Sequence, residues 1–476
     1  PVDAKALLTA RGFCHLFSYR NGDPSRDGQA QNWCAAPPGR ITELFYDSEG
    51  AVRIVVQGTE PFARRDPASA FGPDCATGAV DASPAPASPA IATPAVAGGE
   101  PMAARFIPLC PPSLDEAEER AVIEVLRSGW LTTGAKVTEF EAAFSEKVSA
   151  THSVAVSSCT AALHLCLIQA GVGPGDEVIS TPMTCTATNW PILSRGARIV
   201  WADINPQTGN IDPQSIAKCI TKRTKAIMAV NWGGYPCDID AIRKNAKGIP
   251  IIEDAAHAFG AMYKGKMVGQ SADYTCFSLQ AIKHLTAGDG GLLVVQKESD
   301  YIRGKLLRWY GIDRETRSQY DRIEVDVHEW GYKFHMNDIN ATIALANFED
   351  IDTILKKHRA YAEYYKKHLS GLTRITLLQE DEDFISSYWL FTLLVEDKDA
   401  FIAHMGKHGV MASQVHRRND THPVVAQFKK TLPGVDSFSK HMVCIPVGWW
   451  LKRVDLKHIV HAALEYDRGV LSKKKK

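Results

Sequence analysis

One lysine of the chain stands where its surroundings could make it reactive. Lys283 follows an apolar stretch at residues 274–278 and precedes a glycine-rich return at residues 287–291. Lysine attacks carbonyl groups only as the neutral amine, so a reactive lysine needs a desolvated or cation-rich site that lowers its pKa. A loop between two strands can provide such a site. Taken alone, however, the segment favours an ordinary lysine in a surface loop.

Two acidic residues end another apolar run. Glu253 and Asp254 follow Ile251 and Ile252. A strand there would place both carboxylates at its carboxy-terminal end, the edge where open α/β sheets bind ligands. An aspartate at that edge can keep a ring nitrogen protonated, although Asp254 alone fits a capping role at a strand-to-helix turn at least as well. His257 alone is more typical of a hydrogen-bonded structural histidine than of a catalytic one.

Small residues with hydroxyl groups form a turn that could bind an anion. Residues 156–162 read Val-Ser-Ser-Cys-Thr-Ala-Ala, which is the pattern of a strand that ends where a helix begins. The free backbone N–H groups and the positive dipole end of a helix start attract phosphate. Serine and threonine are also the commonest helix N-caps, and that interpretation is favoured when the turn is considered alone.

Alternating strands and helices must position these residues. Apolar runs predict strands at residues 152–158, 177–181, 198–204, 225–230, 250–255, 274–278 and 291–295. Helical patterns between several of them cover residues 161–170, 213–220 and 300–309. This alternation indicates an α/β fold with a mostly parallel sheet flanked by helices. Longer helices from about residue 338, with a strand near residues 389–395, indicate a smaller carboxy-terminal α+β domain.

The amino-terminal part of the chain is expected to stand apart from this fold. Residues 74–104 are rich in alanine and proline and nearly lack large apolar residues, so we expect a linker there. Residues 41–46 and 52–57 flank a short polar turn and predict a hairpin. The expected domains are a small appendage of unknown role at 1–73, the linker at 74–104, a large domain at 105–337 and a small domain at 338–476.

The composition argues against several kinds of partner and site. Lysine plus arginine and aspartate plus glutamate both number 54, so no net field attracts nucleic acid or an anionic membrane. No apolar run is long enough to span a membrane, and no basic helix-turn-helix pattern is present. The eleven cysteines are odd in number and scattered, which favours a reducing cytoplasm. No metal site is expected, because Cys14, His15 and Cys34 lack a fourth ligand at metal-binding spacing.

Together, in this order and spacing, the three motifs resemble the DegT/StrS family of sugar aminotransferases, within the aspartate-aminotransferase fold type I of pyridoxal-phosphate enzymes. The resemblance extends over about residues 106–467. It also includes Ser-Gly-Trp-Leu-Thr-Thr-Gly, Gly-Pro-Gly-Asp-Glu-Val, Pro-Cys-Asp-Ile-Asp-Ala-Ile and Gly-Tyr-Lys-Phe-His-Met, at residues 128–134, 173–178, 236–242 and 331–336. Several independent motifs in register make this resemblance specific.

The resemblance implies a role for each matching residue. Lys283 matches the lysine that holds pyridoxal 5'-phosphate as a Schiff base, and Asp254 matches the carboxylate that pairs with the pyridine nitrogen. His257 falls near the ring hydroxyl. The positions that match phosphate-binding residues are Ser278, Cys159 and Thr160. The positions that match the lining of the substrate pocket are Thr132 and Thr133.

Two positions differ from the usual family pattern. Many relatives place an aromatic residue where Cys185 stands, so that it stacks on the cofactor ring. Cys185 cannot stack, but it can pack on the ring face as a soft apolar group; Trp190 and Trp232 are alternatives. Relatives commonly have asparagine and arginine where this chain has Lys333 and His335. The resemblance therefore implies that Lys333 contacts the cofactor and His335 the substrate, in ways that differ in detail from the contacts in relatives.

The family resemblance also implies a reaction and its partners. It implies transfer of an amino group from an amino acid, usually L-glutamate, to a nucleotide-linked keto-deoxysugar, by a homodimer whose subunits complete each other's sites. Lys283 argues against the sugar dehydratases of the family, which carry histidine at that position. Amination of a cyclitol or a similar keto ring stays open. A regulatory or binding protein that has kept the fold without catalysis is the alternative from another class, and intact Lys283 and Asp254 weigh against it.

Overall fold

The computed structural model describes residues 41–46, 52–56, 106–314 and 326–469. The chain divides into two compact units, residues 1–98 and 99–476. In the first unit, β1 (Ile41–Tyr46) and β2 (Val52–Val56) pair antiparallel, as the expected hairpin requires. The linker predicted at residues 74–104 and the residues Cys14, His15 and Cys34 lie outside the described residues.

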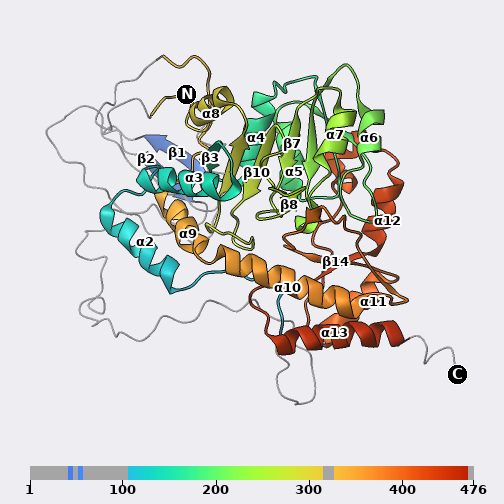
Figure 1. The fold of residues 1–476 in the computed structure, drawn as a ribbon. Helices are drawn as coiled ribbons and strands as arrows, with labels where there is room; N and C mark the ends of the chain where they lie inside the picture. The colour runs from blue at the N-terminus through green and yellow to red at the C-terminus, as the bar shows by residue number, and fades with distance from the viewer. Residues whose placement is uncertain (1–40, 47–51, 57–105, 315–325, 470–476) are drawn as a thin grey trace, which may run out of the picture. The chain divides into compact units, whose positions relative to one another are not determined.

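A seven-stranded sheet forms the centre of the second unit (Figure 1). Its strands follow the spatial order β3-β11-β10-β7-β6-β4-β5. Only β11 runs antiparallel to its neighbours, so the expectation of a mostly parallel sheet is confirmed. The strands are β3 (His152–Val156), β4 (Glu177–Ser180), β5 (Arg198–Trp201), β6 (Thr224–Val230), β7 (Ile251–Asp254), β10 (Tyr274–Ser278) and β11 (Gly291–Val295).

Helices cover both faces of this sheet. Successive side chains of a strand point to opposite faces, and the strand residues accordingly alternate between clusters: Cys276 packs with α4, whereas Phe277 packs with α3. Burial on both faces explains why the strands read as nearly continuous apolar runs. The helices before and within this region are α2 (Glu116–Ser128), α3 (Ala135–Val148), α4 (Cys159–Gln169), α5 (Thr186–Ser194), α6 (Pro213–Cys219), α7 (Ile239–Ala246) and α8 (Glu298–Leu307), with a short 3-10 turn, η3 (Trp232–Gly234).

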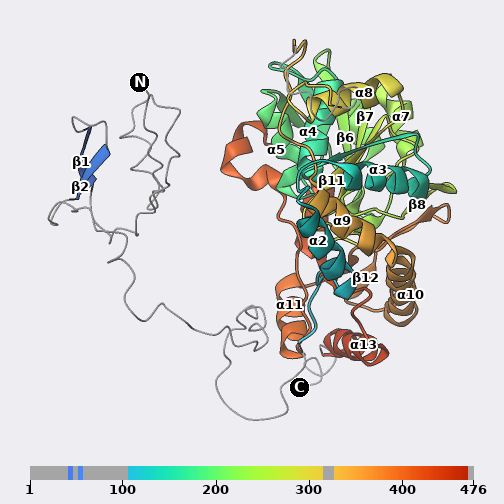
Figure 2. The ribbon, with the colours of Figure 1, turned by 90° about the vertical axis from the view of Figure 1, so that its left-hand side faces the viewer.

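The carboxy-terminal part carries a second, smaller sheet. Two helices lead to it along one side of the molecule (Figure 2), α9 (Asp338–Phe348) and α10 (Ile351–Leu369). Its antiparallel strands have the order β12-β14-β15. Of these, only β14 (Phe391–Val395) matches the one strand expected near residues 389–395. The remaining elements are β12 (Ile375–Leu377), α11 (Lys398–Lys407), η4 (Asn419–Thr421), η5 (Pro423–Phe428), α12 (Pro433–His441), β15 (Met442–Ile445) and α13 (Arg453–Arg468).

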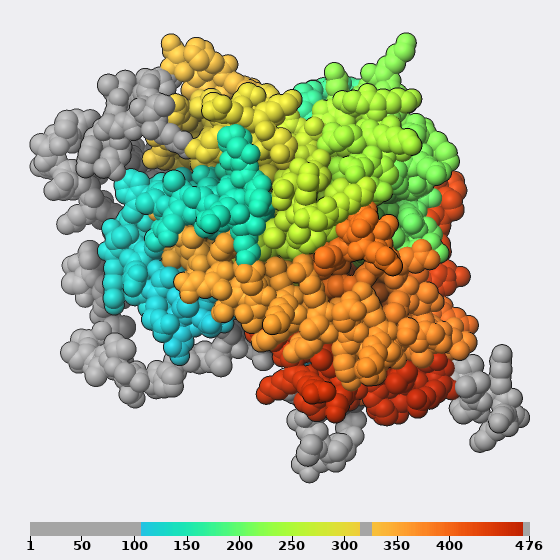
Figure 3. Space-filling model, viewed as in Figure 1, coloured from blue at the N-terminus to red at the C-terminus, as the bar shows by residue number. Residues whose placement is uncertain are grey.

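The two parts of the second unit pack directly against each other. The space-filling view shows the orange and red carboxy-terminal part against the green part of the large sheet (Figure 3). A three-stranded sheet joins β8 (Met262–Tyr263) and β9 (Lys266–Met267) to β13 (Phe384–Ile385). Strand pairing therefore crosses the boundary expected at residue 338, which stays a prediction. Among the described helices, none has the length and apolar character needed to cross a membrane.

Candidate active site

Lys283 lies in the loop that follows β10, and its amine faces an indole ring. The Nζ atom is 3.4 Å from the centroid of the Trp389 ring. The Trp389 Nε1–H group donates a hydrogen bond of 2.8 Å to the carbonyl of Ile282, so the indole is fixed to the residue that precedes the lysine. Trp389 stands just before β14, and the carboxy-terminal part thus closes over the lysine loop.

The electrostatic surroundings make Lys283 more nucleophilic than an ordinary lysine. Burial lowers the pKa of its amine from 10.5 to about 8, and the nearby Asp254 carboxylate opposes this shift. At pH 7 about a tenth of an amine with this pKa is neutral, against roughly one part in 3000 for an ordinary lysine. The structure therefore supplies the desolvated setting that a carbonyl-attacking lysine needs.

Asp254 ends β7, in the middle of the sheet, and its carboxylate is buried. It accepts hydrogen bonds from the Thr188 hydroxyl at 2.6 Å and from the Ala256 N–H group at 3.0 Å, and the thiol of Cys159 lies 3.9 Å away. Burial raises the pKa of Asp254, while the hydrogen bond from Thr188 and the charge of Lys283 lower it. A protonated ring nitrogen beside this carboxylate would keep it ionised.

Glu253, the other acid of the motif, does not share this role. Its carboxylate accepts hydrogen bonds from the Asn231 amide at 2.9 Å and the Thr275 hydroxyl at 3.1 Å, and its side chain is buried. Neighbouring strand residues point to opposite faces of a sheet. Asp254 therefore faces Thr188 and Cys159, whereas Glu253 is hydrogen-bonded within the opposite layer.

His257 belongs to a stack of three flat side chains beside Lys283. Its ring lies 4.0 Å from the Trp389 ring at 25° and 5.6 Å from the His416 ring at 7°. Burial, followed by the charge of Lys283, holds the pKa of His257 well below its usual value. Its Nδ1 atom is buried without a hydrogen-bond partner among the described residues. A neutral, unsatisfied imidazole can still accept or donate one hydrogen bond to a bound molecule.

The start of α4 provides an anion-binding turn next to Asp254. Ser158 caps the helix, because its hydroxyl accepts a 3.1 Å hydrogen bond from Ala161 N–H. In the described part of the chain, no hydrogen bond uses the N–H groups of Cys159 and Thr160, which point out of the first turn as in other helix starts. Gly291 passes so close that an added Cβ would lie 2.4 Å from Cys159 N. The glycine thus allows β11 to pack directly beneath this turn.

These groups fit pyridoxal phosphate. The cofactor needs an amine for its aldehyde, an acid for its ring nitrogen and N–H donors for its phosphate. The amine is that of Lys283, the acid is Asp254, and the N–H donors lie at the start of α4. The Nδ1 atom of His257, which has no partner among the described residues, can form a hydrogen bond with a substituent of the cofactor ring. Ser278 ends β10 on the same edge of the sheet, where its hydroxyl accepts a 3.3 Å hydrogen bond from Gln280 N–H.

Cys185 lies three residues before Thr188, whose hydroxyl donates a hydrogen bond to Asp254. It precedes α5 as the N-cap residue and is half-buried. Trp232, considered above as a replacement for the missing aromatic, is buried in the core, and its Nε1–H donates to Thr392 at 3.1 Å. Trp190 meets the edge of the His422 ring at 5.7 Å. Neither tryptophan shows a ring contact with Lys283 in the described residues.

The remaining predicted site residues form a separate group. Thr133 donates a hydrogen bond of 2.6 Å to Met336 carbonyl, which ties the loop that also contains Thr132 to the segment at residues 331–336. Lys333 is exposed. The His335 ring contacts the Trp309 ring at 3.8 Å between centroids with a tilt of 56°, and burial lowers the pKa of His335 to about 4. Within the described ranges of one chain, no hydrogen bond joins this group to Lys283, so its roles stay predictions.

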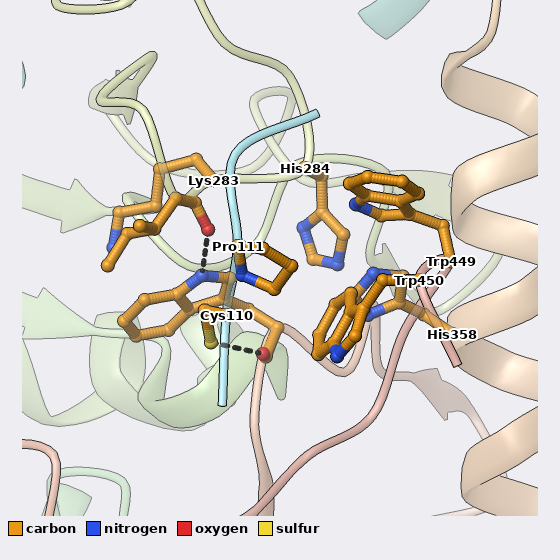
Figure 4. Close-up of a pocket in the computed structure, with 9 residues that line it drawn as sticks. Cys110, Pro111, Lys283, His284, His358, Trp449 and Trp450 are labelled. Carbon is orange, nitrogen blue, oxygen red and sulfur yellow. Dashed lines mark hydrogen bonds between the residues drawn. The ribbon is translucent and has the colours of Figure 1, made fainter. Parts of the chain in front are cut away.

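A small cavity of about 10 Å³ opens beside the lysine (Figure 4). Lys283 lines one side of it, and Trp449 and Trp450 line the other. Its volume corresponds to about one water molecule. His284 and His358, whose rings lie 4.5 Å apart, also line the cavity. The cavity shows that the lysine loop, α10 and the segment before α13 converge at one place.

Trp389, Thr188 and His416 are the site residues that the sequence motifs did not reveal. Trp389 and His416 lie more than 100 residues after Lys283, and only the packing of the carboxy-terminal part brings them to the lysine. Thr188 lies in the segment at residues 182–188, in which the sequence pattern indicated a role for Cys185 alone. Thr188 is a polar residue one helical turn after the N-cap residue of α5. This position, at the edge of the sheet where ligands are expected, could have indicated its role.

Comparison with known proteins agrees with this geometry. Residues 112–464 match the model of the DegT/DnrJ/EryC1/StrS aminotransferase family. The chain is 34% identical to a UDP-4-amino-4-deoxy-L-arabinose–oxoglutarate aminotransferase from Shewanella sediminis over 387 residues, 76% of this chain and 99% of that one. Among solved structures, AtS13 from Actinomadura melliaura is 41% identical with a TM-score of 0.73, over 76% of this chain and 99% of that one.

A further solved structure bears on the cofactor. Spr1654 from Streptococcus pneumoniae, a candidate sugar aminotransferase solved in its PLP form, is 29% identical with a TM-score of 0.71, over 77% of this chain and 99% of that one. The family match covers well over half of the chain, and the site contains the lysine, the acid and the anion-binding turn that this cofactor needs. The chain belongs to the DegT/DnrJ/EryC1/StrS aminotransferase family and is a pyridoxal-phosphate-dependent aminotransferase.

Proposed function

We propose that the chain transfers the amino group of L-glutamate to the keto group of a nucleotide-linked keto-deoxysugar. The observation that carries this proposal is the Lys283 amine, whose pKa of about 8 arises within the same site as the buried Asp254. A lysine of this kind can attack a carbonyl and can also accept a proton at neutral pH. The family match supplies the class of reaction, and the site supplies its groups.

Each residue of the site has a defined task in this proposal. Bound pyridoxal phosphate supplies an aldehyde and an electron-accepting ring. Asp254 would pair with the ring nitrogen, and the N–H groups of Cys159 and Thr160 would hold the phosphate. Lys283 would hold the aldehyde and then, as a free amine, move a proton at the α-carbon of the donor. His257 and Ser278 would complete the contacts to the ring hydroxyl and the phosphate.

Trp389 and His416 act by excluding water from the lysine. Both rings belong to the stack that includes His257, and burial is the largest cause of the lowered pKa of Lys283. A site closed in this way favours the neutral amine before the reaction and protects reactive groups from hydrolysis. The carboxy-terminal part therefore contributes to catalysis through packing.

Support for the two substrates comes from relatives. The Shewanella relative is named for a UDP-linked amino sugar and for oxoglutarate, which is the keto acid left when L-glutamate gives up its amino group. A second relative, 37% identical over 300 residues, is named a spore coat polysaccharide biosynthesis protein of Bacillus subtilis; the match spans 62% of this chain and 77% of that one. Both names concern sugars, which favours a sugar over a cyclitol as the acceptor.

We also propose that the enzyme works in the cytoplasm as a homodimer. The eight cysteines in the described ranges are free thiols, as is usual in a reducing compartment. The exposed Lys333 and the half-buried His335 belong to a segment that Ser157 N–H holds beside β3 through a 2.6 Å hydrogen bond to Phe334 carbonyl. Lys333 would reach the cofactor phosphate of the partner subunit from this position.

The function is tested with the full chain loaded with pyridoxal phosphate. L-glutamate should bleach the visible absorbance of the cofactor and release 2-oxoglutarate, and D-glutamate serves as the control donor. The resulting aminated enzyme is then offered a panel of nucleotide keto-sugars and keto-cyclitols. Return of the original absorbance with a nucleotide keto-sugar supports the proposal. Return with a cyclitol alone, or no bleaching by L-glutamate, contradicts it.

A further inference from the structure

A group of histidines and one glutamate lies on the surface of the carboxy-terminal part. α11 and α13 contact each other there, and both helices lie at the lower end of the second unit in Figures 1 and 2. His404 lies in the last turn of α11, His408 is the C-cap residue that follows this helix, and Glu465 belongs to α13. Ligand atoms of these three side chains, one from each, all lie within 4.8 Å of one another. No other such group of histidine, cysteine, aspartate or glutamate exists in the described ranges.

We propose that His404, His408 and Glu465 form a binding site for a divalent transition metal ion of the zinc class, joining α11 to α13. Two imidazoles and one carboxylate are a ligand set that zinc accepts, with water in the fourth position. Such a set favours zinc, copper or nickel over magnesium and calcium, which prefer oxygen ligands. The site is distinct from the aminotransferase site and does not depend on its function.

The first geometric support is the spacing of His408 and Glu465. The Nε2 atom of His408 is 3.3 Å from the Oε2 atom of Glu465. Two ligands at about 2.0–2.1 Å in a tetrahedral zinc site are separated by roughly 3.3 Å, so this pair already has a suitable spacing. Glu465 is exposed and can rotate, so the wider pairs of the group can shorten around an ion.

The second support is the orientation of His404. Its Nε2 atom lies 2.9 Å from the carbonyl of Ala462. A carbonyl can only accept, so Nε2 carries the proton and Nδ1 carries the lone pair that a metal needs. Metal-binding histidines usually donate their other ring N–H to a carbonyl or carboxylate in this way. The contact with α13 therefore fixes the tautomer that is suited to ligation.

The third support is a further imidazole next to the group. His461 supplies a nearby additional group, because its Nε2 atom is 3.6 Å from the second carboxylate oxygen of Glu465.

The sequence pattern had not suggested this site, since the expectation of no metal site rested on cysteine spacing. His404 and His408 are four residues apart and therefore share one face at the end of a helix. Glu465 is far away in the sequence, and only the packing of α11 on α13 brings it to the pair. A bound ion would thus connect the two helices that cover the small sheet.

The test measures zinc binding to the full chain after treatment with a chelator, by competition with a chromophoric zinc chelator. The parent protein should bind zinc, and the double variant His404→Ala/His408→Ala should bind one equivalent less. Glu465→Gln changes one exposed side chain and should weaken the site roughly tenfold or more. Comparing variants with the parent separates this site from any ligands elsewhere in the chain.

A matched control is His368→Ala. His368 is also half-buried on a carboxy-terminal helix, and its Nδ1–H group donates a 2.8 Å hydrogen bond to the Tyr364 carbonyl, but it belongs to no such group among the described residues. This variant should bind as much zinc as the parent. Zinc should also raise the unfolding temperature of the parent and of His368→Ala, and should raise that of Glu465→Gln by less. Equal zinc stoichiometry and affinity in the parent, the double variant and Glu465→Gln would overturn the proposal.

Discussion

The amine nitrogen of Lys283 lies 3.4 Å from the centre of the Trp389 ring, although the two residues belong to different parts of the fold. The indole affects the amine in two opposite ways. Its face attracts the protonated form by about 0.5–2 kcal/mol, while its bulk excludes water and favours the neutral form. The pKa of about 8 corresponds to a net cost of about 3 kcal/mol for the charged form. Exclusion of water therefore has the larger effect.

The pH dependence of cofactor capture follows from this balance. The neutral amine captures the aldehyde, so capture by the apoprotein should become faster as the pH rises through about 8, the pKa of Lys283. Trp389→Ala should admit water and move the midpoint upward, towards the ordinary lysine value of 10.5. Stopped-flow absorbance at a series of pH values measures the midpoint.

Trp389→Phe is the control for this prediction. Phenylalanine keeps an aromatic face over the amine and loses only the indole N–H group that bonds Ile282. Its midpoint should stay close to that of the parent. A midpoint that is the same in Trp389→Ala and in the parent would show that Trp389 does not set the pKa.

Replacement of the lysine itself should abolish turnover. In Lys283→Ala no described group near Asp254 can both hold the cofactor aldehyde and move the proton. Transamination should fall below detection while the fold, followed by circular dichroism, is kept. Lys297→Ala removes an exposed lysine at the start of α8 and should be fully active. Measurable turnover by Lys283→Ala without added amine would contradict the assignment.

Thr188 is a positioning residue for the acid of the site. Its hydroxyl donates at 2.6 Å to Asp254 and also pairs with Thr184 at 2.7 Å. A hydrogen bond to a charged group is worth about 1.5–3 kcal/mol, so Thr188→Val should slow turnover by roughly tenfold to a hundredfold. Because this bond lowers the pKa of Asp254, its loss should raise that pKa and shift the acidic limb of the pH–rate profile to higher pH.

The matched variants separate positioning from packing. Thr188→Ser keeps the hydroxyl and should restore both the rate and the pH profile. Asp254→Asn should still bind the cofactor but react slowly, because an amide cannot balance a protonated ring nitrogen. A Thr188→Val enzyme with the rate of the parent and an unmoved acidic limb would show that the hydrogen bond to Asp254 has no part in catalysis.

The sequence predicts the local parts of this site well. Asp254 ends one buried strand and Lys283 lies in the loop after another, and strands buried on both faces are easily recognised. The structure brings both to one edge of the sheet, near the start of α4. The ends of several strands were placed too late, as at residue 158, because Ser158 leaves the strand to cap α4.

The contributions of the carboxy-terminal part could not be predicted in the same way. β12 and β15 have three and four residues, which is too short for a strong periodic pattern, and their main pairing is with β14. Trp389 lies two residues before the start of β14, where a tryptophan is typical of an ordinary core position. Its position over Lys283 results from packing between segments that are far apart in the sequence, which local patterns do not record.

The amino-terminal unit is predicted to be dispensable for the reaction. The family match begins at residue 112, and the described site residues all belong to the unit of residues 99–476. A chain that begins at Met102 should therefore show the same turnover per active site as the full chain. Turnover is compared after cofactor content has been matched by absorbance. A truncated chain that is folded and loaded with cofactor yet inactive on every accepted substrate would refute this prediction.

The last prediction concerns Lys333 and the partner subunit. Lys333 is exposed in one chain and follows Tyr332, whose carbonyl accepts a hydrogen bond from Tyr310 N–H, so the backbone that carries the lysine is fixed. A charged ammonium makes a hydrogen bond to phosphate that is about twice as strong as that of a neutral amide. Lys333→Glu places a negative charge there and should weaken cofactor binding in every subunit that depends on it.

Mixing two inactive variants decides whether this contact crosses the dimer. If sites are shared, a dimer of one Lys283→Ala chain and one Lys333→Glu chain contains one site with both changes and one intact site. Activity should then return to about half that of the parent per mixed dimer, because the intact site works alone. Subunit exchange is followed with differently labelled chains, and pairing Lys283→Ala with Asp254→Asn is the control, since both changes affect one chain's own site. Exchange without recovered activity would place the role of Lys333 within its own subunit.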